Sequence, residues 1–125
     1  MLDSRPVHHI ALVVQDLQRA EGFYVGLLGL HVTRRWHDSQ GAPRSVWLAL
    51  GRDGLLMLER GDARPPTGGG WHLLAWRIHA EERAALESQL AAKGVPIINR
   101  SAYTLYIEDP EGNRIGLSHW PDPAS

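Results

Sequence analysis

The chain consists of two halves in which the same predicted elements follow one another. His9 and His72 each begin a strand-like run and lie 63 positions apart, while Gly29 and Gly94 each follow a helix-like run and lie 65 positions apart. In each half a strand and a helix are followed by three further strands. A repeat of this length predicts two copies of one βαβββ unit, each of which needs the other to bury a face.

The first half has clear boundaries for its elements. Four runs have the composition of strands: residues 8–14, 30–36, 45–50 and 55–59. Between the first two runs, a helical pattern covers 17–28, with Asp16 as a suitable N-cap and Gly29 where a helix-ending glycine belongs. The run 8–14 is almost entirely apolar or His, which predicts a strand buried on both faces.

The second half repeats this order after a Pro- and Gly-rich connector at 61–70. Its predicted elements are a strand at 71–78, a helix at 80–93, and strands at 95–99, 103–108 and 114–119. We therefore predict one α+β domain over 1–125, with module one at about 5–61, the linker at 61–70 and module two at about 71–120. The two βαβββ modules would stand in tandem, with helices on the outer face of the sheet.

Composition excludes several classes of protein. The 125 residues carry a formal net charge of −1 with acids and bases mixed, so no basic block predicts nucleic-acid binding. No apolar run approaches the roughly 20 residues that a membrane helix needs. The absence of cysteine excludes disulfides, thiolate catalysis and Cys-zinc sites. A cytoplasmic location is the default expectation.

Three side chains on predicted strands could hold a metal ion. Alternation along a strand places His9, Ala11 and Val13 on one face, and it likewise groups Leu55, Met57 and Glu59. His72 begins the corresponding strand of the second half, where it shares a face with Leu74 and Trp76. Two imidazoles and a carboxylate are a common ligand set for a divalent ion. The alternative is that both histidines are hydrogen-bonded or surface residues and that Glu59 is solvated.

Two longer motifs carry a family resemblance. The segment HHIALVVQDLQRAEGFYVGLLGL and the later DPEGNRI, together with the repeated βαβββ unit, resemble the vicinal-oxygen-chelate superfamily. That superfamily contains glyoxalase I, extradiol dioxygenases, fosfomycin-resistance enzymes and bleomycin-resistance binding proteins. The resemblance implies a glyoxalase-like half-barrel, a homodimer and a small-molecule ligand, without nucleic-acid or membrane partners.

The same resemblance implies metal ligands. The family's first three positions fall on His9, Glu59 and His72, and the ion would be Zn, Ni, Mn or Fe. His8 would lie on the opposite face and be structural. The fourth position, a Glu in most enzymes of the superfamily, is Gly116 here. Glycine neither binds metal nor moves a proton, so the proton carrier would have to be Glu59 or a metal-bound hydroxide.

Other positions also depart from the enzymes of the superfamily. Val13 and Ala63 stand where glyoxalase I holds glutathione through Arg and Asn, so a glutathione-dependent glyoxalase I is not expected. Ser118 shares the face of Gly116, but a hydroxyl is a weak ligand. His119 would reach that face only if Gly116 formed a β-bulge, and we interpret His119 as an exposed residue at the strand end.

Two functions remain open on the sequence. We favour a divalent-metal-dependent enzyme, lyase or dioxygenase-like, that binds vicinal oxygens of a small substrate on the metal, with Glu59 as catalytic residue. The alternative is a metal-free protein that sequesters an aromatic or cationic compound, as bleomycin-resistance proteins do, in a pocket lined by Trp47 and Trp76. Gly116 favours the alternative, whereas His9, Glu59 and His72 favour the enzyme.

Overall fold

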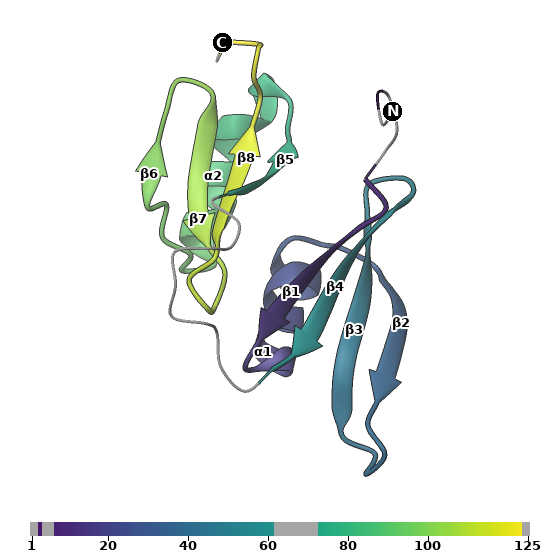
Figure 1. Cartoon of the computed structure of the whole chain (residues 1–125). Coiled ribbons are helices and arrows are strands. Elements are labelled where there is room, and N and C mark those ends of the chain that lie inside the picture. Colours follow the sequence, from purple (N-terminus) through teal and green to yellow (C-terminus); the bar gives the residue numbers. More distant parts are fainter. Residues whose placement is uncertain (1–2, 4–6, 62–72, 124–125) are drawn as a thin grey trace. The chain divides into compact units, whose positions relative to one another are not determined.

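The computed structural model describes Asp3 and residues 7–61 and 73–123. The chain forms two units, Met1–Thr67 and Gly68–Ser125. Within the described residues, each unit contains a four-stranded sheet with helical segments beside it (Figure 1). The prediction of an α+β fold with two βαβββ units is confirmed. No helix in these residues is long and apolar enough to cross a membrane.

The first unit follows the predicted order of elements. These are β1 (His9–Val14), α1 (Leu17–Glu21), the π-helix η1 (Gly22–Leu27), β2 (Val32–His37), β3 (Pro43–Leu50) and β4 (Gly54–Arg60). The sheet order is β1-β4-β3-β2, with β1 parallel to β4 and the other neighbours antiparallel. The parallel pair closes the unit, because the crossover through α1, β2 and β3 returns the chain beside its first strand.

The core of the first unit lies on one face of its sheet. Val14, Leu48, Leu56 and Leu58 are fully buried there, together with Tyr24 of η1. Along β1 the residues alternate between exposed and more buried positions. The prediction that this strand is buried on both faces is therefore wrong, because the helical segments cover one face only.

The predicted helix begins and ends where its capping residues indicate. The carboxylate of Asp16 accepts a hydrogen bond from the backbone N–H of Arg19 at 3.0 Å, as an N-cap should. Gly29 adopts a φ of +79°, a conformation that favours glycine at the end of a helix. Between these residues the α-helix changes to a π-helix at Gly22, which the sequence pattern did not predict.

The second unit repeats the topology. Its elements are β5 (Leu74–Arg77), the 3₁₀-helix η2 (Ala80–Glu82), α2 (Arg83–Ala92), β6 (Asn99–Arg100), β7 (Thr104–Glu108) and β8 (Arg114–Ser118). The sheet order is β5-β8-β7-β6, which matches the first unit. Of the strand predicted at 95–99, only Asn99 is in a strand, because β6 consists of Asn99 and Arg100. Pro96 explains part of this loss, because proline cannot donate to a sheet ladder.

The motif DPEGN forms the turn between β7 and β8. The buried carboxylate of Asp109 accepts hydrogen bonds from the backbone N–H groups of Glu111 and Asn113, and from the Asn113 amide at 2.7 Å. Gly112 has a φ of +84°, so the turn needs glycine there. This hairpin sets the register of β8 and therefore the position of Gly116.

The Asp109→Asn variant tests how strongly this turn is held. The amide keeps one acceptor oxygen but loses the charge and turns an N–H group towards a donor. We expect the free energy of unfolding to fall by about 1 kcal/mol, measured by urea denaturation. Asp53→Ala, in an exposed turn of the first unit, is the matched control and should change little. Equal losses in the two variants would contradict this account.

Candidate functional site

The face of the first sheet opposite the helical core carries most of the predicted site residues. Strand register places residues of all four strands on this face, which we call the helix-free face. Its members are His9, Ala11 and Val13 of β1, Leu55, Met57 and Glu59 of β4, Ser45, Trp47 and Ala49 of β3, and Arg34 and Trp36 of β2. The face combines indole rings with a carboxylate and an imidazole.

His9 lies at the start of β1 and is exposed. Its Nδ1 is 2.9 Å from Nδ1 of His8, and the two rings meet edge to face. His8 was predicted to point away on the opposite face, but it precedes the strand, where alternation does not apply. On the helix-free face, the neighbours of His9 on β4 are Leu55, its register partner, and Met57. Neither offers an oxygen or nitrogen ligand.

Glu59 lies far from His9 on the same face. Its register partners are Val13 on β1 and Ser45 on β3, whereas His9 pairs with Leu55. Four positions along a strand correspond to about 13 Å. Two side chains that rise from one face at that spacing do not converge on one ion, whose bonds are about 2 Å long. Glu59 therefore does not fit as a ligand of an ion held by His9.

Three buried polar side-chain atoms on this face have no hydrogen-bond partner among the described residues. They are Nε1 of Trp36, Nε1 of Trp47 and the hydroxyl oxygen of Ser45. The indole rings contact each other, with centroids 5.5 Å apart, and Ser45 pairs with Trp36 in the register. Trp47, which the sequence predicted as a pocket residue, thus lies on the helix-free face. The sequence analysis did not single out Trp36 or Ser45. Sequence alternation alone could have placed Trp47 with Ser45, but not Trp36 beside them.

Gly116 lies in the middle of β8, between Ala75 of β5 and Tyr106 of β7. The register runs through it without a shift, so the bulge that would have turned His119 to this face is absent from β8. A Cβ built on Gly116 would meet the side chains of Leu73, Ala75 and Thr104 at 3.2–3.3 Å. The space beside Gly116 is therefore already filled by apolar atoms of neighbouring side chains.

Trp76 and His72 were predicted to share a face of their strand. Trp76 pairs with Leu117, which pairs with Leu105, and both leucines are buried. Trp76 therefore lies on the core face of the second sheet, opposite Gly116, and does not join the residues around it. His72 lies outside the described residues.

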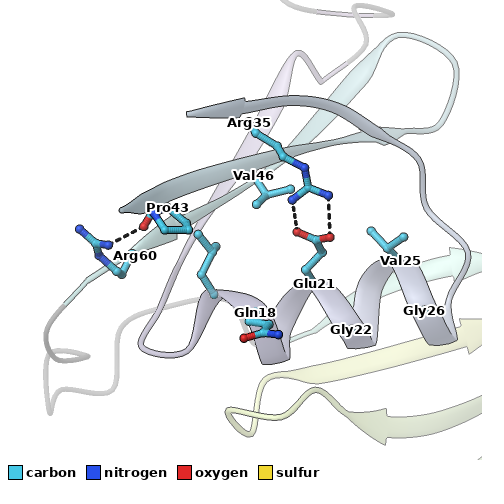
Figure 2. A pocket seen from close by; sticks show the side chains of 10 residues that line it. Gln18, Glu21, Gly22, Val25, Gly26, Arg35, Pro43, Val46 and Arg60 are labelled. Carbon is cyan, nitrogen blue, oxygen red and sulfur yellow. Dashed lines mark hydrogen bonds and ion pairs between the residues drawn. The ribbon is translucent and has the colours of Figure 1, made fainter. Parts of the chain in front are cut away.

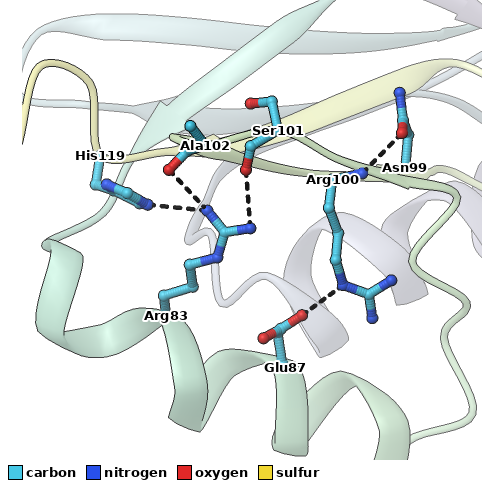
Figure 3. A network of polar contacts seen from close by, with 7 residues as sticks. All are labelled: Arg83, Glu87, Asn99, Arg100, Ser101, Ala102 and His119. Atoms are coloured by element: carbon cyan, nitrogen blue, oxygen red, sulfur yellow. Dashed lines mark hydrogen bonds and ion pairs between the residues drawn. The ribbon is translucent and has the colours of Figure 1, made fainter. Parts of the chain in front are cut away.

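His119 is a buried residue, so its interpretation as an exposed strand end is wrong. It is 1% exposed, and its Nε2 lies 3.1 Å from Nη1 of Arg83 (Figure 3). Its Nδ1 contacts the carbonyl oxygen of Asp122. A guanidinium only donates and a carbonyl only accepts, so His119 carries its proton on Nδ1. The same guanidinium donates to the carbonyl oxygens of Ser101 and Ala102. His119 thus ties the C-terminal segment to α2.

A groove of about 740 Å³ lies on the other side of the first sheet, beside the helix (Figure 2). Glu21 of α1 and Arg35 of β2 form a two-pronged ion pair in it. The hydrogen bonds from Arg35 lower the pKa of Glu21 below its usual value. Arg60 is also held, by the Pro43 carbonyl and by Asp38. Each of these three charged side chains therefore already has a partner.

The predicted metal site can now be tested against its donors. Among the described residues, no group of three His, Asp or Glu side chains could hold an ion. Glu59 is displaced from His9 along the sheet, and Gly116 provides no ligand. The metal-binding side chains among the described residues therefore do not match the predicted ligand set.

Comparison with known proteins adds sequence relatives. A family model described as the Glyoxalase/Bleomycin resistance protein/Dioxygenase superfamily matches residues 7–117. The chain is 28% identical over 121 residues to a protein named glutathione transferase FosA from Serratia marcescens. That match covers 94% of this chain and 81% of the relative.

Solved structures share the fold. Lactoylglutathione lyase from Agrobacterium tumefaciens aligns with a TM-score of 0.73 at 22% identity, covering 96% of this chain and 99% of that one. The fosfomycin resistance protein FosX from Listeria monocytogenes aligns at 0.72 and 19%, covering 93% and 92%. These two similarities concern the fold. Because the family model spans most of the residues, the chain belongs to the Glyoxalase/Bleomycin resistance protein/Dioxygenase superfamily.

Proposed function

We propose that this chain is a metal-independent small-molecule-binding protein whose site is the helix-free face of the first unit. One observation carries the proposal: the indole N–H groups of Trp36 and Trp47 and the hydroxyl of Ser45 are buried near one another without hydrogen-bond partners among the described residues. Family members that sequester a drug need no catalytic metal, which agrees with the lack of a carboxylate beside His9 on the described part of β4 and at Gly116.

The physical reason lies in the cost of unpaired polar groups. A buried donor without an acceptor costs about 1–3 kcal/mol, and most such groups in proteins are satisfied. A ligand whose binding uncovers these buried atoms and brings acceptors to Trp36, Trp47 and Ser45 recovers part of this free energy. The two indole rings add a large apolar contact area with few rotatable bonds. This combination of apolar rings and a few placed polar groups is typical of ligand sites.

The experiment observes the indole N–H groups directly. The ¹⁵N–¹H spectrum resolves tryptophan indoles, and Trp36→Phe and Trp47→Phe assign the two signals of interest. Titration with 2-naphthamide, a flat aromatic amide with a carbonyl acceptor, should shift both signals. The indole of Trp120, whose residue is 62% exposed on the second unit, is the internal control and should stay in place. Unmoved Trp36 and Trp47 signals at millimolar 2-naphthamide would contradict the proposal.

A metal-dependent enzyme is the second candidate. The observation that favours it is the contact between Nδ1 of His8 and Nδ1 of His9, because such a contact orients a metal-binding imidazole and leaves its Nε2 available. The similarity to glutathione transferase FosA supports the same candidate. His9 and His72 stay predicted metal ligands. Glu59 is not proposed as a ligand, because it lies too far from His9 along the sheet.

Metal content distinguishes the two candidates. For a binding protein, elemental analysis after dialysis against Ni, Zn, Mn and Fe(II) should find well below one ion per chain. About one ion per chain, lost in His72→Ala with an unchanged circular dichroism spectrum, would support the enzyme instead. Glu59→Gln should leave any metal content unchanged, because the register separates it from His9. Loss of metal in Glu59→Gln would contradict the register argument.

We also propose that the chain forms a homodimer, as its resemblance to the superfamily implied. Sedimentation equilibrium should give twice the mass of the chain at micromolar concentration. The mass of a single chain across that range would contradict the proposal.

A further inference from the structure

One buried titratable side chain takes no part in the proposed ligand site. His119 follows β8 and is 1% exposed. Its Nε2 lies 3.1 Å from Nη1 of Arg83 on α2 (Figure 3). Its Nδ1 contacts the carbonyl oxygen of Asp122. Histidine is the side chain that ordinarily changes charge between about pH 5 and 8, so these contacts decide which charge state the folded unit accepts.

The two contacts accept only the neutral ring. A carbonyl oxygen only accepts and a guanidinium only donates, so Nδ1 carries the proton and Nε2 accepts from Arg83. A second proton would have to bind at Nε2, where its N–H would point at the N–H groups of Arg83. The ring would then be a cation beside another cation, so repulsion would replace the hydrogen bond.

The other groups around the ring bring no negative charge to it. Tyr103, just before β7, contributes an aromatic ring whose centroid is 5.9 Å away. Arg77 of β5 donates to the Trp120 carbonyl at 3.2 Å, which brings a second guanidinium to the same segment. The exposed Asp122 approaches the ring through its carbonyl rather than its carboxylate. Protonation would therefore add a positive charge to a segment that already holds two guanidinium groups.

The carboxylates of η2 and the start of α2 are directed elsewhere. Glu81 is exposed, and Glu82 accepts from a backbone N–H within its own capping box. Glu87 pairs with Arg100 of β6 (Figure 3). Among the described residues no carboxylate contacts His119. The protonated ring thus has no counter-ion in this part of the chain.

We propose that His119 is a pH-sensitive switch that holds the C-terminal segment 119–123 against α2. With a neutral ring, Nε2 accepts from Arg83 and the segment stays docked. When a proton from solvent binds Nε2, this contact breaks and the segment is released. Two backbone hydrogen bonds should open with it, from the His119 amide to the Tyr103 carbonyl and from the Asp122 amide to the His119 carbonyl. The inference is separate from the proposed binding function, which uses residues of the first unit.

Hydrogen exchange of the full chain at two pH values tests the switch. Protection factors are compared at about pH 8 and about pH 5, after correction for the intrinsic dependence of exchange on pH. We expect the amides of His119 and Asp122 to lose protection at least about tenfold at the lower pH. The Val95 amide, which donates to the Leu90 carbonyl at the end of α2, is the internal control and should keep its protection. Unchanged protection of the segment, or an equal loss at Val95, would overturn the inference.

A side chain that cannot be protonated tests the role of His119. His119→Gln keeps an oxygen that can accept from Arg83 but does not titrate, so the protection of the Asp122 amide should be equal at both pH values. His37→Gln, at an exposed position of β2, is the matched control and should keep the loss seen in the parent. A pH-dependent loss that persists in His119→Gln would overturn the inference.

An NMR titration of the His119 ring in the parent protein adds a measurement that needs no variant. The ring signals should move over the same pH range in which the Asp122 amide loses protection. Ring signals that move while this amide stays protected would overturn the inference, whatever the stability of His119→Gln.

Discussion

Replacing Ser45 with alanine is expected to stabilise the ligand-free protein, by about 1–2 kcal/mol in the free energy of unfolding. Ser45 is 1% exposed, and its hydroxyl has no partner among the described residues. In the unfolded chain water satisfies that hydroxyl, so folding removes its hydrogen bonds and returns none. Alanine fits in the same space without the polar atom, and a gain of this size corresponds to several degrees in Tm.

Ser118→Ala is the matched control and should have the opposite sign. The oxygen of Ser118 accepts a hydrogen bond from the Thr104 hydroxyl at 2.9 Å, in the equivalent strand pair of the second unit. Its removal leaves the buried Thr104 without that acceptor, so we expect a loss of about 1 kcal/mol. Urea denaturation of the two variants and the parent measures both changes. A loss of stability in Ser45→Ala would show that Ser45 has a partner in solution and would weaken the proposed site.

His119→Leu is expected to cost about 2–4 kcal/mol of the free energy of unfolding. The almost fully buried imidazole accepts a hydrogen bond from Arg83 (Figure 3). It also donates one to the Asp122 carbonyl. Leucine preserves the apolar bulk but makes neither hydrogen bond. It leaves the Arg83 guanidinium with the Ser101 and Ala102 carbonyls alone. The C-terminal segment after β8 should therefore detach more easily.

The consequence of His119→Leu is measured by two methods. Urea denaturation gives the loss of stability, and hydrogen exchange should show faster exchange at the amides of His119 and Asp122. In the parent protein the His119 amide donates to the Tyr103 carbonyl oxygen, and the Asp122 amide donates to the His119 carbonyl oxygen. His37→Leu, at an exposed position of β2, is the control and should change the free energy by less than about 0.5 kcal/mol. A His119 variant as stable as the parent would contradict the assigned network.

Local chemistry accounts for the parts of the fold that the sequence predicts well. Asp16 caps α1 because a short carboxylate reaches the free N–H groups of a helix start. Asp109 and Gly112 specify a turn because one supplies acceptors and the other tolerates a positive φ. The order of the elements follows from hydrophobic periodicity, and the repeat shows that the two halves share it. Each of these signals involves residues close together in the chain.

The candidate site was less predictable, and the reason is strand register. Alternation correctly grouped Leu55, Met57 and Glu59 on one face. It could not say which of them lies beside His9, because register depends on the pairing of two strands distant in sequence. The structure places Leu55 there and Glu59 about 13 Å along the sheet, which separates the predicted ligands.

The sequence by itself determined the βαβββ repeat, the caps and turns, and the loss of a side chain at Gly116. Only the tertiary structure decided that Trp36, Ser45 and Trp47 lie together, with polar atoms that find no partner in the described part of the chain. It also decided that Trp76 lies on a core face and that His119 is buried. The physical reason is that burial and hydrogen-bond satisfaction depend on every neighbour in space, whereas a sequence pattern reports only neighbours along one strand or helix.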